Sequence, residues 1–110
     1  MGLSLRLNLR FLSHEFTGFI LLTIVTEAVL EPTLAKAIMA HGARGYTVTD
    51  SRGNGSHGVR SGAWGQGSNI RIEVIGNEEI INKIVTHLRD TYDQNYGLLM
   101  FSSRVDVHSR

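Results

Sequence analysis

The segment SRGNGSHGVRSGAWGQG, residues 51–67, combines many glycines with side chains that can bind an anion. Six of its last fifteen residues are glycine, and Arg52, His57 and Arg60 lie among them. Glycine lets backbone N–H groups approach a ligand closely, and arginine can form two parallel hydrogen bonds with a phosphate or a carboxylate. This arrangement is typical of an anion-binding loop, and a loop of ~15 residues inside a compact domain is usually either functional or disordered.

The same segment, which we call the glycine-rich loop, contains Gly53-x-Gly55-x-x-Gly58, the spacing of a dinucleotide-binding fingerprint. That fingerprint requires a helix directly after the glycines, so that the helix N-terminus meets the pyrophosphate. Here the glycines lead to SNIRIEVIG, residues 68–76, which alternates as a strand does. We therefore reject a Rossmann phosphate loop. Two interpretations remain open: a loop that binds a ligand, which we favour, and a solvated flexible hairpin.

Two helices and four strands are predicted around this loop. Residues 31–42 and 78–93 carry apolar side chains at three- and four-residue spacing, with Gly42 as a C-terminal stop and Asn77 as an N-cap. Apolar or alternating runs predict strands, and these lie at residues 19–27, 43–51, 68–76 and 97–107. The glycine-rich loop therefore connects the second strand to the third.

This order predicts an α+β, ferredoxin-like βαββαβ fold, with a four-stranded antiparallel sheet and both helices on one face. Because the strands carry apolar residues in both phases, we expect the face without helices to pack in an oligomer. We assign residues 19–110 to this domain and residues 1–18 to an N-terminal extension. The alternating apolar residues of the extension fit an edge strand or a partner-docking arm, and a flexible start of the chain is an equal alternative.

Composition excludes several kinds of site. The 110 residues include no cysteine, which excludes disulfides, thiolate metal sites and cysteine nucleophiles. A formal net charge of +1 gives no electrostatic case for binding nucleic acid or a membrane. The five histidines show no metal-ligand spacing, and no acid–base pair or nucleophile triad is readable, so we predict neither a metal site nor catalytic residues. We expect a cytoplasmic protein.

Two stretches, GARGYTV (residues 42–48) and GYTVTDSRGNGSHGVRSG (residues 45–62), resemble the PII signalling protein superfamily, and in particular its PII-like regulators of inorganic carbon uptake. The resemblance covers residues 19–107. It implies a homotrimer with three clefts between subunits, each of which binds an adenine nucleotide. The glycine-rich loop is similar to the T-loop of that family, which folds over the phosphates and presents a surface to a partner protein.

The resemblance also assigns eight residues to nucleotide binding: Gly45, Tyr46, Thr47, Gly55, Ser56, His57, Arg60 and Gly97. The first three would line the cleft, the four loop residues would hold phosphate, and the last would lie beside the cleft. Arg60 would supply the bidentate charge, whereas His57 stands where relatives often have arginine. Trp64 is either a partner-binding hot spot or a ring folded back on its own loop.

Some residues depart from the nitrogen-sensing PII proteins that this chain resembles. Residues 90–101 read DTYDQNYGLLMF, with Leu98 where a lysine is expected, and the loop has no tyrosine after Tyr46. We therefore expect AMP or ADP as the ligand rather than ATP, and neither uridylylation nor 2-oxoglutarate sensing. The sequence ends in VDVHSR without a cysteine-bearing tail, so a redox switch there is not expected.

The resemblance is nearest to the carboxysome-associated, bicarbonate-transport-linked PII-like branch, in which adenine nucleotide and bicarbonate bind together. It implies a regulatory protein, not an enzyme, that reports energy and inorganic carbon status to a bicarbonate transporter or a carboxysome-related partner. Any membrane association would be peripheral, through that partner. The alternatives are a slow nucleotide phosphohydrolase that uses the same cleft and a nucleotide-independent oligomeric interaction module.

Overall fold

The computed structural model describes residues 18–53 and 68–109, with the backbone alone described for residues 93–96. Residues 1–17, and with them almost all of the predicted N-terminal extension, lie outside the described residues, as do residues 54–67 of the glycine-rich loop. The described elements follow one another as β1 (Phe19–Glu27), a short 3-10 turn η1 (Ala28–Leu30), α2 (Glu31–Ala40), β2 (Thr47–Ser51), β3 (Asn69–Asn77), α4 (Glu78–Tyr96) and β4 (Leu99–Val105). This confirms the predicted βαββαβ order.

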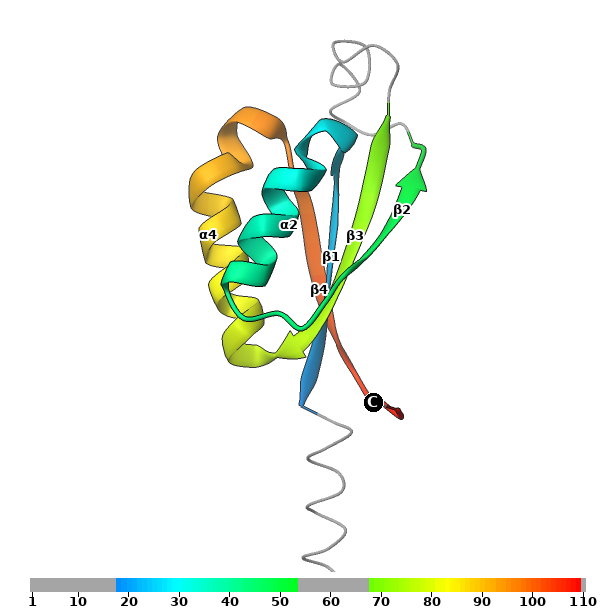
Figure 1. Cartoon of the computed structure of the whole chain (residues 1–110), viewed down its shortest axis with the longest axis vertical. Helices are drawn as coiled ribbons and strands as arrows, with labels where there is room; N and C mark the ends of the chain where they lie inside the picture. The colour runs from blue at the N-terminus through cyan, green and yellow to red at the C-terminus, as the bar shows by residue number, and fades with distance from the viewer. Residues whose placement is uncertain (1–17, 54–67, 110) are drawn as a thin grey trace, which may run out of the picture.

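The four strands form one antiparallel sheet in the order β2-β3-β1-β4, and both helices cover the same face of it (Figure 1). The register explains this arrangement. Leu22 pairs with Val74 and Ile24 with Ile72, so the even-numbered apolar residues of β1 and β3 point together toward the helices. The predicted ferredoxin-like architecture is confirmed.

The hydrophobic core fills the layer between the sheet and the helices. Its members are buried leucine, isoleucine, valine and alanine side chains: Leu22, Ile24, Leu30, Leu34, Ile38, Ala43, Ile70, Ile72, Val74, Ile81, Ile84, Leu88 and Leu98. In α4 the buried positions 81, 84 and 88 recur at three- and four-residue spacing, as predicted for one face of an amphipathic helix.

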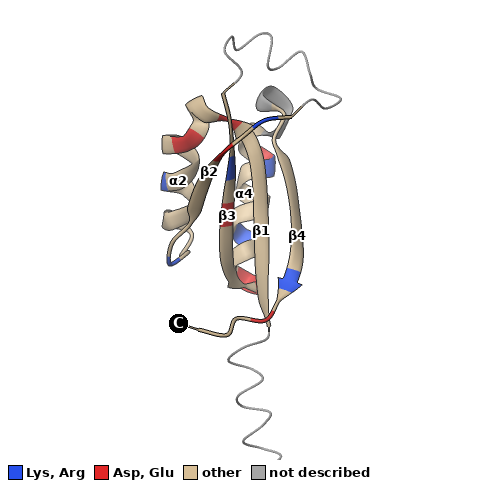
Figure 2. Ribbon diagram, turned by 90° about the vertical axis from the view of Figure 1, so that its right-hand side faces the viewer, with Lys and Arg blue, Asp and Glu red and all other residues tan. Residues whose placement is uncertain are grey.

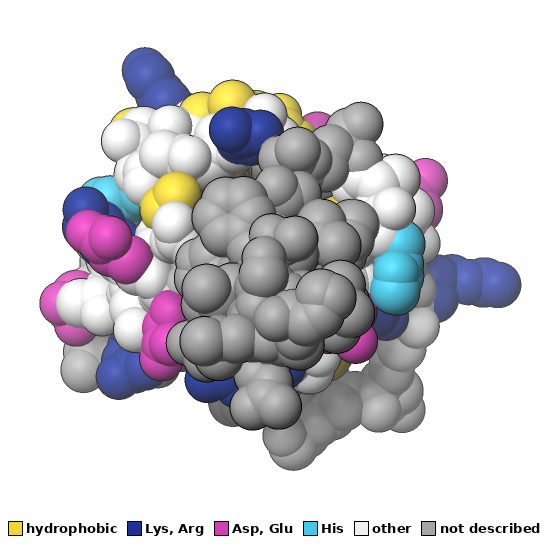
Figure 3. All heavy atoms as spheres, turned by 90° about the horizontal axis from the view of Figure 1, so that it is seen from below, with side chains coloured by type: hydrophobic (Ala, Val, Ile, Leu, Met, Phe, Trp, Pro, Cys, Tyr) yellow, Lys and Arg dark blue, Asp and Glu magenta, His cyan; other side chains and the backbone are white. Residues whose placement is uncertain are grey.

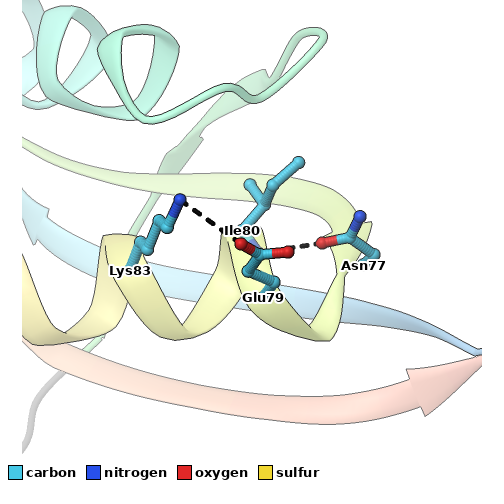
Figure 4. A network of polar contacts seen from close by, with 4 residues as sticks. All are labelled: Asn77, Glu79, Ile80 and Lys83. Carbon is cyan, nitrogen blue, oxygen red and sulfur yellow. Dashed lines mark hydrogen bonds and ion pairs between the residues drawn. The ribbon is translucent and has the colours of Figure 1, made fainter.

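The start of α4 is fixed by the predicted cap. The backbone N–H of Ile80 donates a hydrogen bond of 2.8 Å to the side-chain oxygen of Asn77, which satisfies one of the free N–H groups of the first turn (Figure 4). Glu78 and Glu79 lie in that turn, where their negative charge is favourable near the helix N-terminus. Glu79 also pairs with Lys83 one turn later, at 3.5 Å.

Most elements end within a few residues of the prediction: α2 ends at Ala40 instead of residue 42, and β3 spans Asn69–Asn77 instead of residues 68–76. α4 continues to Tyr96 instead of residue 93, and Gly97, with φ +59°, follows it. β2 begins at Thr47 instead of residue 43, because Ala43 still belongs to the turn that ends α2. The N–H of Ala43 donates a hydrogen bond of 3.4 Å to the carbonyl of Ile38, and its side chain is buried in the core. β4 spans residues 99–105 instead of 97–107.

Candidate functional site

The sheet face that carries no helix exposes large apolar side chains. Ile75 of β3 is 48% exposed, and Leu99 and Phe101 of β4 are 53% and 49% exposed. Figure 2 shows this face, with acidic and basic residues on β3 and near the strand ends and uncharged residues along the middle of β1. The register places Thr47, Glu73, Thr23 and Phe101 in one row across all four strands. The odd-numbered residues of every strand therefore form a second, open face.

A hollow of about 380 Å³ lies on this open face, where β2 begins beside β3. It is lined by Leu21, Gly45, Tyr46, Thr47, Glu73 and Ile75. The four strand residues among these come together because Leu21 pairs with Ile75 and Thr47 pairs with Glu73. Gly45 and Tyr46 belong to the segment that leads into β2. We call this space the sheet hollow.

The sheet hollow exists because β2 is shorter than β3. β2 pairs with residues 69–73 only, so Ile75 faces no β2 residue. The chain between α2 and β2 turns away toward the helix, which leaves Tyr46 39% exposed at the edge of the open space. A short edge strand thus creates a concave corner in an otherwise continuous sheet.

The sheet hollow combines an apolar surface with a few polar groups, the usual composition of a small-molecule site. Leu21, Ile75 and the ring of Tyr46 supply the apolar part. Polar groups come from the Thr47 hydroxyl, the backbone at Gly45 and the Glu73 carboxylate, whose Oε2 lies 3.6 Å from Nε of Arg71. None of the described residues that line the hollow is cationic. A phosphate bound nearby would need cationic groups from elsewhere.

The structure brings together three of the predicted nucleotide-binding residues, Gly45, Tyr46 and Thr47, which line the sheet hollow side by side. Four others belong to residues 54–67 and lie outside the described residues: Gly55, Ser56, His57 and Arg60. Trp64, the predicted partner contact, lies outside them as well. The described geometry therefore bears on only half of the predicted nucleotide-binding set.

Gly97, the eighth predicted residue, lies in a different place. It precedes β4, which is the edge strand opposite β2, and β4 begins beside Val25 near the end of β1. The C-terminal end of β2, the start of β3 and the start of β4 share the upper end of the sheet in Figure 1. We call this the loop end of the sheet. Within one chain, Gly97 is therefore near the loop end and not at the sheet hollow.

The loop end contains buried polar side chains. Thr26 and Glu27 at the end of β1 are almost completely buried, and Glu27 lies in register with Asn69 of β3, which in turn pairs with Ser51 of β2. The Oγ1 of Thr26 and the Oδ1 of Asn69 have no hydrogen-bond partner among residues 18–53 and 68–109. Buried polar atoms are normally satisfied, so these two atoms are exceptions among the described residues.

Sequence reasoning missed Leu21, Glu73 and Ile75 as site residues. No motif marks them, because they are ordinary strand residues that only the pairing of β1 with β3 brings together. Ile75 follows the polar residues Arg71 and Glu73 in the same strand phase, but a single exposed isoleucine is ordinary on a protein surface and does not mark a site.

Charged side chains of one sign do not gather on the face of the molecule that Figure 3 shows. Seen from below, acidic and basic side chains are interspersed around the rim of the molecule (Figure 3). Residues 18–53 and 68–109 contain no group of three or more histidine, aspartate or glutamate side chains placed to hold a metal ion. The same residues include no helix that is long and apolar enough to cross a membrane.

The fold is similar to that of solved PII-like structures. CPII, a nitrogen regulatory PII-like protein from Thiomonas intermedia K12, has been solved bound to ADP, AMP and bicarbonate; it is 19% identical, covers 84% of this chain and 94% of its own, and superposes with a TM-score of 0.69. CPII bound to ADP and bicarbonate is 21% identical, with coverage of 83% and 89% and a TM-score of 0.71. At this identity the similarity supports the fold.

Two further comparisons concern the family. A PII-like signalling protein from Thermus thermophilus is 36% identical, with 81% of this chain and 87% of that chain covered and a TM-score of 0.69. The model of the family described as nitrogen regulatory protein P-II matches residues 19–110, which include the sheet, both helices and the glycine-rich loop. The chain therefore belongs to the nitrogen regulatory protein P-II family, as a PII-like regulatory protein.

Proposed function

We propose that this chain forms a homotrimer that binds AMP or ADP, together with bicarbonate, in clefts between its subunits. Each cleft is made from the sheet hollow of one subunit and the loop end of the next. The ligand changes the order of the glycine-rich loop, which carries the signal to a bicarbonate transporter or a carboxysome-related partner.

One observation carries the proposal: the predicted site residues divide between two places in a single chain. Gly45, Tyr46 and Thr47 line the sheet hollow, whereas Gly97 and the strand ends that flank the glycine-rich loop lie at the loop end. The length of β2, from Thr47 to Ser51, already separates the two places by about 13 Å. A second copy of the chain can supply one set to the other, which supports a site between subunits.

The open sheet face supports the assembly. Ile75, Leu99 and Phe101 are each about half exposed in the isolated chain, on the same face as the sheet hollow. Apolar side chains that lie together on one surface favour burial against another protein. A C3 arrangement gives each hollow one neighbour and each loop end one neighbour, so every subunit contributes once to two clefts.

The chemistry of the sheet hollow suits an adenine ring. Tyr46, Leu21 and Ile75 offer flat or apolar contact, and the Thr47 hydroxyl and Gly45 backbone offer hydrogen bonds to the ring edge. The phosphates and bicarbonate are anions, and we assign them to Gly55, Ser56, His57 and Arg60 of the glycine-rich loop. The ligands of CPII, which are ADP, AMP and bicarbonate, support this choice. Leu98 in place of a lysine favours AMP or ADP over ATP.

Calorimetric titration with AMP, ADP and ATP, each with and without bicarbonate, tests the ligand. We expect Tyr46→Ala to weaken ADP binding about tenfold, because base–aromatic stacking contributes about 1–3 kcal/mol. Thr47→Ala should also weaken binding, whereas Thr49→Ala is the matched control, since Thr49 follows on the same strand face but does not line the hollow. No binding of any of these nucleotides at millimolar concentration would end the proposal.

A mixing experiment tests whether the two halves come from different subunits. Tyr46→Ala damages the hollow, and Arg60→Ala damages the loop, where loss of a charge-assisted hydrogen bond should cost about 1.5–3 kcal/mol. In trimers formed by co-expressing both variants in equal amounts, about a quarter of the clefts would combine an intact hollow with an intact loop. Recovery of tight ADP binding in that fraction supports a shared site, and no recovery places both halves in one chain.

Light scattering after size-exclusion chromatography gives the oligomeric state, and a monomer at micromolar concentration would contradict the trimer. Phosphate release from ATP distinguishes the regulator from a phosphohydrolase. We expect no steady turnover, because binding, not hydrolysis, carries the signal. Multiple turnovers per site would favour the enzyme instead.

A further inference from the structure

A second hollow lies on the other side of the molecule, between the two helices. It has a volume of about 410 Å³, is widely open, and is lined by His41, Asn82, Lys83, Thr86 and His87. His41 follows the last residue of α2, and His87 lies in the middle of α4. Among the described residues, none lines both this helix hollow and the sheet hollow. The helix hollow is therefore separate from the proposed nucleotide site.

The two histidine rings are close together in this hollow. Their centroids lie 4.9 Å apart, and their planes are inclined by 52°. When two imidazoles bind one tetrahedral ion through metal–nitrogen bonds of about 2.0–2.1 Å, their centroids are about 5 Å apart. The observed separation is close to that spacing, and it also falls within the range of about 4.5–7 Å found for ordinary ring contacts. Both histidines are partly exposed and line open space, so an ion can reach them.

Both rings are attached to well-fixed backbone. The N–H of His41 bonds to the carbonyl of Ala37 at 3.1 Å, and that of Gly42 to the carbonyl of Met39 at 3.1 Å, which holds the end of α2 in a defined turn. His87 lies between core residues of α4, and its ring contacts the ring of Tyr92 edge-on, with 6.3 Å between the two ring centroids. Ligands carried on rigid elements lose little freedom when an ion binds.

The charges around the helix hollow are compatible with a cation. Among the described residues that line it, Lys83 carries an amino group, whose Nζ lies 3.5 Å from Oε2 of Glu79. Asn82 and Thr86, which also line it, are neutral and carry oxygen atoms. In the described parts of the chain no third histidine or carboxylate completes a group of three, so the protein supplies two ligands and water must fill the other positions.

We propose that His41 and His87 bind one divalent late first-row transition-metal ion, of the Zn²⁺ or Ni²⁺ type, which links the end of α2 to α4. Imidazole nitrogen selects such ions over Mg²⁺ and Ca²⁺, which require oxygen ligands. Because their ring nitrogens must be unprotonated to bind, the ion competes with protons. The linkage would join the two helices on the face opposite the proposed nucleotide site.

Titration of the full chain with Ni²⁺, Zn²⁺ and Mg²⁺ tests the proposal. We expect one Ni²⁺ or Zn²⁺ per chain at this site and no saturable binding of Mg²⁺. His41→Gln and His87→Gln should each weaken this binding at least tenfold. His108→Gln is the matched control: it removes a histidine outside the helix hollow and should bind as the unaltered chain does. Equal binding by the unaltered chain and the His41→Gln/His87→Gln double variant would overturn the proposal.

A second measurement needs no variant, and so does not depend on how the variants fold. Nuclear magnetic resonance of the ¹⁵N-labelled imidazoles follows each histidine while Zn²⁺ is added. We expect saturable changes at one nitrogen of His41 and one of His87, with the same midpoint for both. Independent midpoints, or no change at either ring up to millimolar Zn²⁺, would show that the rings are merely packed against each other and would refute a shared ion.

Discussion

The two faces of the sheet are made from the same four strands but differ in how far their side chains are buried. On the face covered by the helices, Leu22, Ile24, Ile72 and Val74 are almost completely buried. On the open face, Ile75 of β3 and Leu99 and Phe101 of β4 stay about half exposed. The period of two along a strand separates these sets. One set of side chains completes the fold of a single chain, and the other remains available to a second chain.

This contrast indicates where stability and function are located. Truncating a buried residue leaves a cavity inside every copy of the chain, whereas truncating an exposed residue affects only what that residue contacts in an assembly. Substitutions on the covered face should therefore change the free energy of unfolding. Substitutions on the open face should change association and nucleotide binding instead.

Ile84→Ala should lower the free energy of unfolding by about 2–5 kcal/mol, because Ile84 is 1% exposed between α4 and the sheet. Denaturant unfolding measures the change. Ile75→Ala is the matched control on the open face and should cost the dissociated chain much less. If the two substitutions destabilise the dissociated chain equally, the open face contributes to the fold as much as the core does, and the contrast is wrong.

Phe101→Glu should weaken association a hundredfold or more, about 3 kcal/mol, because assembly would bury an unpaired carboxylate in place of a ring. Sedimentation or light scattering over a range of concentrations measures this effect. Since Phe101 is 49% exposed in the isolated chain, circular dichroism should show a folded monomer. Ser102→Glu, on the neighbouring residue of β4, is the control. An unfolded chain, or an intact trimer, would contradict the assignment of this face.

Asn77→Ala should lower the free energy of unfolding by about 1 kcal/mol, because the N–H of Ile80 loses its 2.8 Å acceptor at the start of α4. Asn77→Asp, which keeps an acceptor oxygen, should restore most of that loss. Thermal unfolding compares the two. The effect should be the same in the assembled protein and in the Phe101→Glu monomer, since the cap belongs to the helix layer. A loss of stability confined to the assembly would show that the cap acts through the contact between subunits and not through the helix layer.

Lys83→Gln should have the smallest effect, about 0.3–0.5 kcal/mol, because the pair with Glu79 lies at i,i+4 on the exposed side of α4. The difference should vanish near 1 M salt, where the Debye length is about 3 Å. Unfolding curves at low and high salt check both statements. A loss above about 1 kcal/mol, the upper end for exposed pairs, or one that salt does not reduce, would show that the solvent side of the helix layer contributes more than surface pairing.

The order of elements was predictable because each has a local signature. The three- and four-residue spacing in α4, Asn77 as its cap, and the alternation in β3 are all visible in the sequence, and the structure confirms them. The ends of elements were less predictable, because they depend on contacts over distance. β2 begins at Thr47 and not at Ala43, because the side chain of Ala43 is buried in the core. α4 continues to Tyr96 because the first glycine after its start is Gly97.

The site was predictable only in part. Gly45, Tyr46 and Thr47 came from a resemblance between short motifs, and the structure places all three around one hollow. Leu21, Glu73 and Ile75 complete that hollow through the register of β1 with β3, which joins residues about 50 positions apart and leaves no local signal. The nearness of His41 to His87 has the same origin, because it depends on how α2 packs against α4.

The central position of β1 also has a consequence for how the chain is made. β1 pairs with β3 on one side and with β4 on the other, where Val25 of β1 lies opposite Leu99 of β4. At a synthesis rate of about 5–20 residues per second, β4 is synthesised several seconds after β1. Until then at least one edge of this nine-residue strand is unpaired. Nascent chains stalled before β4 should therefore be preferred substrates of chaperones.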